Sequence, residues 1–133
     1  MKRRRFLPLV AAVPLGGCLD RSPLPVLDSL WLVNDRDEPH DATVTVEEDG
    51  DRLYERTFRL GTGDGDGRPA NLTEESPVEG PGRYVVTARM DGERTIEVDA
   101  ADVVDGDENC LTVRFTFLDN GSTDWWTKSY REC

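Results

Sequence analysis

The sequence has a single histidine, His40, which follows Pro39 in a polar stretch. One imidazole in such a place gives no Ser/His/Asp or Cys/His nucleophilic centre and no multi-histidine metal cluster. A blue-copper site, which needs two histidines and a free cysteine, is excluded as well. The glycine-rich segment Gly61–Gly67 lacks the Lys-Ser/Thr pair and the following helix of a phosphate-binding loop. We therefore expect neither catalytic residues nor a cofactor, and we expect His40 to be exposed to solvent.

Basic residues are scarce beyond the first five positions. The 133 residues include 27 acidic and 16 basic side chains, for a net charge of -11. Four of the 16 basic residues lie at positions 2–5, so the chain after Cys18 keeps 12 of them against all 27 acidic residues, a net charge of -15. So acidic a surface does not neutralise phosphates, which excludes nucleic acid as a partner.

Long hydrophobic runs are absent too. A membrane-spanning helix needs roughly 20 apolar residues, and the run Phe6–Leu15 has only about half that length. It follows the basic residues Lys2–Arg5 and precedes Gly16 and Gly17, which is the arrangement of a cleaved signal peptide. We therefore predict that residues 1–17 are a signal peptide.

Two short motifs in this segment resemble known export signals. Arg3-Arg4-Arg5-Phe6-Leu7 resembles the twin-arginine pattern, which directs chains that fold before export, although the general secretion route also accepts a basic start. Leu15-Gly16-Gly17-Cys18 resembles a lipobox, which implies that Cys18 is lipidated. Because one lipid chain anchors a protein only weakly, two chains on Cys18 are expected to hold it on the extracellular face of the membrane.

The composition after Cys18 is biased in a further way. Arginine outnumbers lysine eleven to one, and aspartate outnumbers glutamate 16 to 11. With the export motifs, this composition resembles that of exported lipoproteins of salt-loving, haloarchaeal organisms; a GC-rich genome is the alternative explanation. High salt suits so acidic a domain, because the Debye length falls to about 3 Å at 1 M salt and screens the self-repulsion.

There are only three cysteines in the chain. With Cys18 lipidated, Cys110 and Cys133 remain as a pair. Outside the cytoplasm such a pair is expected to form a disulfide.

Alternation of apolar and polar residues dominates the chain from Ser29 onward, which is typical of strands. We predict seven strands, at 29–34, 42–48, 52–60, 83–90, 93–99, 110–118 and 123–131. Tight turns are expected at Asp49-Gly50, Asp91-Gly92 and Asn120-Gly121. Residues 61–81 are expected to be a long loop with room for one short extra strand, and residues 18–28 an extended tether.

These elements predict an all-β fold: one immunoglobulin-like antiparallel β-sandwich of about seven strands over residues 29–133. Gly80-Pro81-Gly82-Arg83-Tyr84, just before an alternating strand, resembles the later strands of immunoglobulin-like surface modules. If every strand reverses direction, the loops 35–41, 61–82 and 100–109 share the end farthest from the tether. They carry 13 carboxylates, so an acidic pole is expected there, with Cys110 and Cys133 at the same end.

Two Asp-Gly-Asp runs are weak candidates for binding Ca²⁺, namely Asp64 with Asp66 and Asp105 with Asp107. Calcium takes six to eight oxygen ligands, which such loops can supply. Neither run has the spacing of an EF-hand, and solvated acidic loops are the alternative. No other metal site is expected.

Trp125 and Trp126 are adjacent, so a strand turns their rings to opposite faces. One ring is expected to enter the core and the other to stay partly exposed. An exposed tryptophan, with Trp31 or Tyr130, could stack on a sugar or on a partner protein. Cross-strand packing is the alternative.

Two tripeptides fit the acceptor pattern for N-glycosylation, Asn71-Leu72-Thr73 and Asn120-Gly121-Ser122. Both are expected in loops. Asn71 is the favoured acceptor of the two, because Asn120 also suits a turn.

The sequence thus predicts a membrane-anchored cell-surface lipoprotein without catalytic activity. Its module is expected to be structural or to bind an envelope protein. The alternative is a ligand-binding module for Ca²⁺ or carbohydrate.

Overall fold

The computed structural model describes residues 24–62, 69–104 and 106–133. In them the chain forms eight strands in two sheets and one short helix, so the expected all-β sandwich is confirmed. Within the described residues, no helix has the length and hydrophobicity that a membrane crossing requires. The predicted signal peptide and Cys18, together with Asp64, Asp66 and Asp105, lie outside the described residues.

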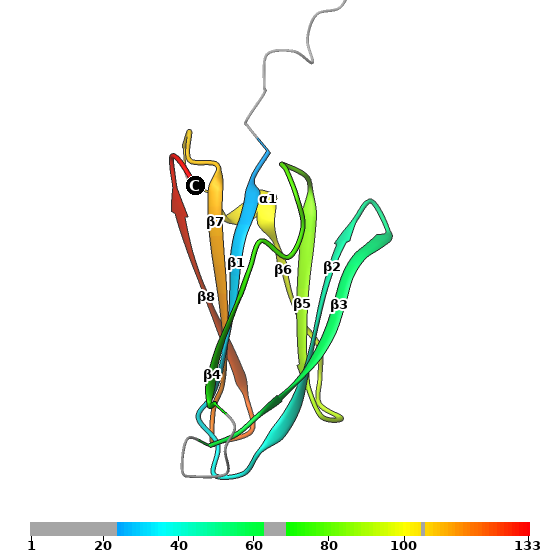
Figure 1. Ribbon diagram of the computed structural model, residues 1–133, viewed down its shortest axis with the longest axis vertical. Helices are drawn as coiled ribbons and strands as arrows, with labels where there is room; N and C mark the ends of the chain where they lie inside the picture. The colour runs from blue at the N-terminus through cyan, green and yellow to red at the C-terminus, as the bar shows by residue number, and fades with distance from the viewer. Residues whose placement is uncertain (1–23, 63–68, 105) are drawn as a thin grey trace, which may run out of the picture.

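Two four-stranded sheets pack face to face (Figure 1). The first, here called the β1 sheet, has the order β4 (Asn71–Glu75), β1 (Val26–Asn34), β7 (Cys110–Phe117) and β8 (Thr123–Tyr130). The second, the β2 sheet, has the order β3 (Asp51–Leu60), β2 (His40–Glu48), β5 (Tyr84–Met90) and β6 (Ile96–Asp99). Neighbouring strands are antiparallel, except that β1 and β7 run parallel. The helix α1 (Ala100–Val103) follows β6 directly.

The core lies between the two sheets and is built by alternation along each strand. Leu30 and Leu32 of β1 are 1% exposed, and Phe115 of β7 is fully buried. Val44 and Val86 meet them from the β2 sheet and are also fully buried. Because side chains alternate between the faces of a strand, this inward apolar set is the pattern that the sequence displays.

Some element boundaries differ from the prediction. The strand β1 begins at Val26, three residues inside the expected tether, because Val26 pairs with Cys110 and Leu27 is buried. The extra strand in the long loop is β4. The helix α1 was not predicted, since four residues are too few to show a helical period. Its start is capped by Asp99, whose carboxylate accepts a hydrogen bond from the Ala101 backbone N–H at 3.1 Å.

The three predicted turns have different geometries. Both residues of Asp49-Gly50 have positive φ, 51° and 86°, as a two-residue hairpin requires. In Asp91-Gly92 only the glycine does. The third turn is longer than predicted: the Leu118 backbone N–H donates to the Ser122 carbonyl at 2.9 Å, with Gly121 at φ 90° between them. With this extra residue in the turn, the register places Cys110 opposite Tyr130.

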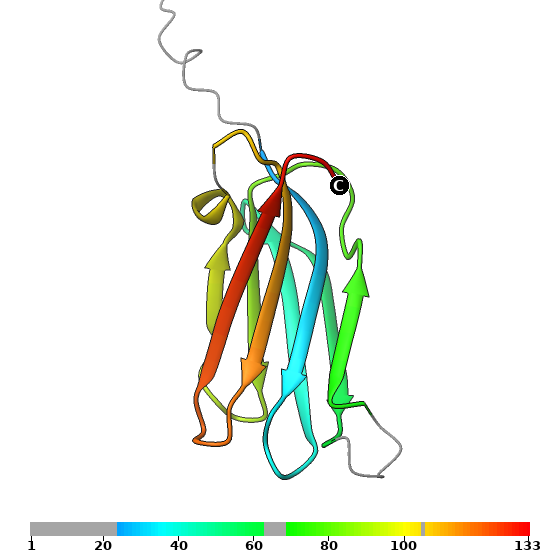
Figure 2. The ribbon, with the colours of Figure 1, turned by 90° about the vertical axis from the view of Figure 1, so that its left-hand side faces the viewer.

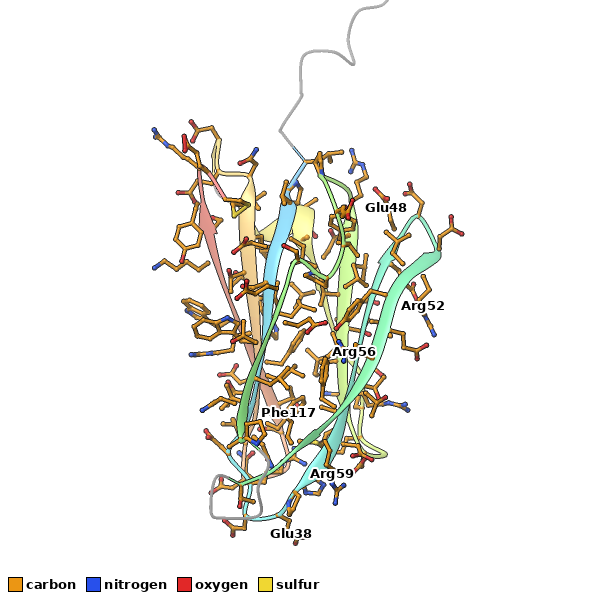
Figure 3. All side chains as sticks on the ribbon, viewed as in Figure 1. Glu38, Glu48, Arg52, Arg56, Arg59 and Phe117 are labelled. Carbon is orange, nitrogen blue, oxygen red and sulfur yellow. A yellow bond between two sulfur atoms is a disulfide. The ribbon has the colours of Figure 1, made fainter. Side chains whose placement is uncertain are left out.

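The prediction of one acidic pole far from the tether is wrong. Because β4 adds a reversal within the segment 61–82, the segment divides between the two ends of the sandwich, and the loop 104–109 returns to the end where β1 begins. Figure 1 shows the C-terminus and α1 at that same end, and Figure 3 labels Glu38 at the opposite one. Cys110 and Cys133 therefore lie near the start of β1, and acidic residues occupy both ends.

A polar contact closes the gap between the edge strands β3 and β4. Arg56 points inward from β3, and its Nη1 donates to Glu74 Oε2 at 3.0 Å (Figure 3). The Tyr54 hydroxyl donates to the same oxygen at 3.0 Å. Burial, with the nearby Glu74 carboxylate, raises the pKa of Tyr54 to about 12, so this donor stays protonated. An inward-pointing charge on an edge strand also discourages pairing with another chain.

The run that resembles immunoglobulin-like modules forms a tyrosine corner. The Tyr84 hydroxyl donates to the backbone carbonyls of Gly80 and Glu79, at 2.7 and 3.0 Å. Gly82 lies under the ring, where a Cβ atom would come within 2.7 Å of Tyr84 Cζ. The position therefore requires glycine for close packing.

Candidate functional site

The outer face of the β1 sheet is turned toward the viewer in Figure 2. Three of the aromatic residues that the sequence pointed to, Trp31, Trp126 and Tyr130, are exposed on this face. The register places Thr73, Trp31, Arg114 and Trp126 in one row across β4, β1, β7 and β8. Trp31 and Trp126 are 40% and 42% exposed. Tyr130, two rows further along β8, is 41% exposed, with the Lys128 ammonium 5.2 Å from its ring centre. We call this outer face the aromatic face.

Arg114 lies at the centre of that row and lacks an acidic partner among the described residues. Its guanidinium stacks on Trp126 at 5.0 Å from the ring centre. Its Nε atom is fully buried without a hydrogen-bond acceptor in the described part of the chain. Arg36, Arg56 and Arg131 each pair with a carboxylate. Arginines 83, 89 and 94 share with Arg114 the lack of an ion pair among the described residues. A buried donor without an acceptor costs roughly 1–3 kcal/mol. The Nη groups of Arg114 also lack a hydrogen-bond partner among the described residues, and they are the donors that an added oxygen ligand could use.

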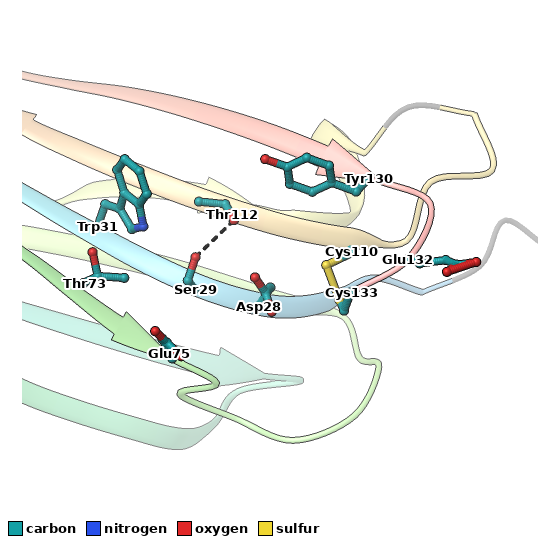
Figure 4. Close-up of a pocket in the computed structure, with 10 residues that line it drawn as sticks. All are labelled: Asp28, Ser29, Trp31, Thr73, Glu75, Cys110, Thr112, Tyr130, Glu132 and Cys133. Carbon is teal, nitrogen blue, oxygen red and sulfur yellow. Dashed lines mark hydrogen bonds between the residues drawn. A yellow bond between two sulfur atoms is a disulfide. The ribbon is translucent and has the colours of Figure 1, made fainter.

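Two hollows flank Trp31 on the aromatic face. The one called the disulfide hollow has a volume of about 630 Å³ and is shown in Figure 4. It runs from Trp31 to the disulfide, and its floor includes the hydrogen-bonded hydroxyls of Ser29 and Thr112, 3.1 Å apart. Its walls carry the carboxylates of Asp28, Glu75 and Glu132.

The second hollow, called the β4–β1 groove, has a volume of about 320 Å³. Its lining includes Trp31, Val33, Asn71, Thr73 and Arg114. Arg114 is the charged residue that lines this groove, whereas carboxylates line the disulfide hollow, so the two hollows carry charge of opposite sign.

The disulfide is present as predicted. Cys110 and Cys133 are bonded, with their Cα atoms 5.1 Å apart. Asp28 comes close to both sulfur atoms, so that these three side chains could in principle hold a metal. Both sulfurs are already bonded to each other, however, and neither is the thiolate that a metal requires. This cluster is therefore structural.

Calcium binding stays a prediction. Of the four aspartates, Asp107 alone lies within the described residues, and its carboxylate is 3.5 Å from Arg131 Nε. The ion pair gives the carboxylate a partner other than a metal.

Trp125 and Trp126 point to opposite faces, as their adjacency requires. Trp126 stands opposite Arg114 on the aromatic face, and Trp125 stands opposite Phe115 on the inner side. The prediction that one of them enters the core is wrong, since Trp125 is 43% exposed. The reason is that β8 is the edge of its sheet, so one flank of Trp125 has no neighbouring strand.

The two possible glycosylation sites differ in their surroundings. Asn71 is the first residue of β4, in a strand and not in a loop, and it is exposed beside the β4–β1 groove. Asn120 is in the predicted turn, where its Oδ1 accepts from the Ser122 hydroxyl at 2.6 Å and from the Ser122 N–H at 3.0 Å. The Asn120 side chain thus helps to hold the turn.

Sequence reasoning missed an ion pair at the end of the sandwich opposite the start of β1. The guanidinium of Arg36 donates to both oxygens of Glu93, with Nη2 to Oε1 at 2.9 Å, and its Nε donates to the Leu118 carbonyl at 2.8 Å. The hydrogen bonds from Arg36 hold the pKa of Glu93 below its ordinary value, and they raise the pKa of Arg36. Nothing in the spacing of residues 36, 93 and 118 marks them as neighbours, because the topology alone brings their loops together.

His40 begins β2 and is not in a loop. The expectation of an exposed histidine holds only in part, because the side chain is 26% exposed and Nδ1 lies 3.4 Å from Asp91 Oδ2. The pair ties β2 to the turn after β5.

Comparison with known proteins places most of this sandwich in one family. The family described as a halobacterial Ig-like domain has a sequence model that matches residues 38–124. No curated protein matches the chain. The matched residues include Arg114 and Asn71 but not Trp31, Trp126 or Tyr130, so the aromatic residues of the face come from outside the match.

Proposed function

The chain belongs to the halobacterial Ig-like domain family, and on this premise we propose that it is a lipid-anchored accessory module of a halophilic cell surface. The immunoglobulin-like sandwich is typical of non-catalytic structural and binding modules. In this proposal Cys18 carries the lipid, residues 1–17 direct export, and the sandwich contacts a protein of the cell envelope.

The short segment between Cys18 and the first strand suits a membrane anchor. Seven residues separate Cys18 from Val26, where β1 begins. At roughly 3.3 Å per residue they reach at most about 25 Å, so the sandwich would stay close to the membrane. The end with α1 and the C-terminus would face the lipid, and the loops that follow β1 and β7 would lie at the end away from it.

The single observation that carries the accessory role is the contrast between the two outer faces. The outer face of the β2 sheet is polar, with hydrogen-bonded threonine pairs such as Thr43 and Thr57, 2.9 Å apart. The aromatic face instead exposes Trp31, Trp126 and Tyr130. Half-exposed tryptophan and tyrosine are the residues that dominate binding energy at protein interfaces.

The anchoring is tested by Cys18→Ser in a haloarchaeal host. The protein should move from the membrane fraction into the medium, because the lipid attachment is lost. Cys133→Ser is the matched control: it removes a cysteine and the disulfide but should remain with the membrane. Membrane retention of Cys18→Ser would contradict the anchor.

The partner is tested by photo-crosslinking from position 126 in intact cells. A single crosslinked envelope protein, lost when the probe is moved to Thr57 on the opposite outer face, supports the proposal. Equal crosslinking from both positions would contradict it.

Carbohydrate binding is the second candidate, and the same aromatic face favours it. Tryptophan rings beside hydroxyl groups, as at Trp31 with Thr73, suit the apolar face and the hydroxyls of a sugar. Saturable quenching of tryptophan fluorescence by oligosaccharides, abolished in Trp31→Ala, would support it. A titration without saturation would count against it.

A further inference from the structure

We propose that Asn71 carries an N-linked glycan and that its first sugars lie in the β4–β1 groove, over Trp31 and beside Arg114. The inference rests on the proposed surface location, since the sugar must be added outside the cell. It deepens the second candidate function, carbohydrate binding, because the carbohydrate on the aromatic face would be attached to this chain itself.

The acceptor residues are presented to solvent on the aromatic face. In β4, Asn71 and Thr73 are two residues apart, so both side chains leave the strand on the same side. Both are exposed, and neither side chain has a hydrogen-bond partner among the described residues. Because β4 is an edge strand of five residues, an enzyme can approach it from the open side. Export in the folded state would leave this acceptor accessible.

The groove beside Asn71 is shaped and lined for a sugar. Thr73 stands directly opposite Trp31, and Asn71 stands opposite Val33, next to Trp31 along the strand. A chain that leaves Asn71 and leans over the sheet therefore meets Val33 first, and Trp31 is its next neighbour on the same face. The groove volume of about 320 Å³ lies within the range of small-ligand sites, about 300–1,000 Å³.

Arg114 supplies the polar side of the groove. Its guanidinium stacks on Trp126 and lacks an acidic partner within the described residues, and its Nε has no acceptor there. The buried Nε is out of a ligand's reach, so sugar oxygens in the groove would accept hydrogen bonds from the two Nη groups, which have no hydrogen-bond partner among the described residues. The disulfide hollow on the other side of Trp31 offers carboxylates, which suit sugar hydroxyl donors further along the glycan.

The attachment is a substitution without change of oxidation state. The donor is an oligosaccharide linked through its anomeric carbon to a lipid phosphate. The Asn71 Nδ2 forms a bond to that carbon, the bond from carbon to phosphate oxygen breaks, and the lipid phosphate leaves as an anion. The amide nitrogen loses one proton to solvent.

Asn120 provides an internal comparison. Its side-chain oxygen is held by Ser122 in the turn, and no aromatic ring lies in its row, since the loop lies beyond the last pair of β7 and β8, Phe117 with Thr123. We therefore expect the glycan on Asn71.

The first test is the mass of the full-length chain produced in a haloarchaeal host, with analysis of the tryptic peptide that ends at Arg83. Wild type and Thr73→Ser, which keeps the acceptor pattern, should carry the glycan. Asn71→Gln and Thr73→Val, which destroy the pattern, should not. An unmodified Asn71 in protein recovered from the cell surface overturns the proposal, as does a glycan on Asn120 alone.

The second test asks whether the glycan packs on the face. Loss of the glycan through Asn71→Gln should lower the melting temperature by about 4 °C in wild type. The same change should lower the melting temperature little in a Trp31→Ala background, where the ring under the sugar is gone. In an Arg114→Met background the decrease should be smaller than in wild type. Equal losses in all three backgrounds would mean that the sugar points into solvent, which overturns the groove contact.

The outcomes separate this inference from the proposed function. Protein retained inside the cell would contradict the surface module itself. Protein on the surface without sugar at Asn71, which binds added oligosaccharide and shows quenched tryptophan fluorescence, would support the second candidate function and overturn the attached glycan.

Discussion

At the scale of single residues, the clearest link from sequence to structure is Tyr84. The spacing of Gly80, Gly82 and Tyr84 suggested an immunoglobulin-like module, and the structure gives the physical reason. The ring needs a glycine beneath it, and the hydroxyl needs the two carbonyls that the preceding turn presents. This local arrangement is readable from sequence because all its parts lie within six residues.

Tyr84→Phe removes that hydroxyl and leaves two carbonyl groups without their donor. We expect a loss of about 1–2 kcal/mol in the free energy of unfolding, because each net hydrogen bond contributes about 1 kcal/mol. Urea unfolding in 3 M KCl measures it. Tyr130→Phe is the matched control, since its hydroxyl has no partner among the described residues. Equal losses in the two variants would contradict the role of the corner.

The burial of a tryptophan side chain cannot be predicted from the residues next to it in sequence. The opposite directions of Trp125 and Trp126 follow from the backbone alone. Whether either ring is covered depends on which strands lie beside β8, and those are set by the sheet order. The aromatic face could therefore be suspected from sequence, while its row with Arg114 could not.

At the scale of elements, long alternating strands were predictable and short ones were not. Asn71–Glu75 carries two glutamates and one leucine, which is a weak strand pattern. It is a strand because β1 offers it an edge, and because Glu74 meets Tyr54 and Arg56 from the other sheet. Since β4 changes the direction of the chain, its weak pattern was also the cause of the misplaced acidic pole.

The link between Arg36 and Glu93 predicts how stability depends on pH. The folded pKa of Glu93 is lowered, so its contribution is present above the ordinary glutamate pKa and is lost as the pH falls through the lower folded value. Glu93→Gln should therefore have a lower free energy of unfolding than wild type at pH 7. Acidification below about pH 4.5 should lower that free energy less in the variant than in wild type. Urea unfolding midpoints between pH 7 and pH 3 measure the difference.

Glu97→Gln serves as the control for that series, because Glu97 is exposed on β6 and has no ion pair among the described residues. Its pH profile should match that of the wild type. If acidification lowers the urea unfolding midpoints of the Glu93 and Glu97 variants by the same amount, the pair with Arg36 contributes nothing specific to stability.

At the scale of the whole molecule, charge connects composition with environment. The chain after Cys18 has 27 acidic against 12 basic residues, and the described ion pairs join few of the acids. Acidic residues are found at both ends, on edge strands and around the disulfide hollow. Repulsion is therefore spread over the surface, and screening should act on the whole sandwich.

The sandwich should melt at a higher temperature in 3 M than in 0.1 M KCl, because the Debye length falls from about 10 Å at 0.1 M to about 3 Å at 1 M. Salt also strengthens apolar burial, so a charge variant must separate the two effects. Glu75→Gln, Glu97→Gln and Glu132→Gln together remove three exposed charges that lack ion pairs within the described residues. This triple variant should raise the midpoint at 0.1 M and change it little at 3 M. A gain of the same size at both salt concentrations would show that repulsion between carboxylates is not what salt relieves.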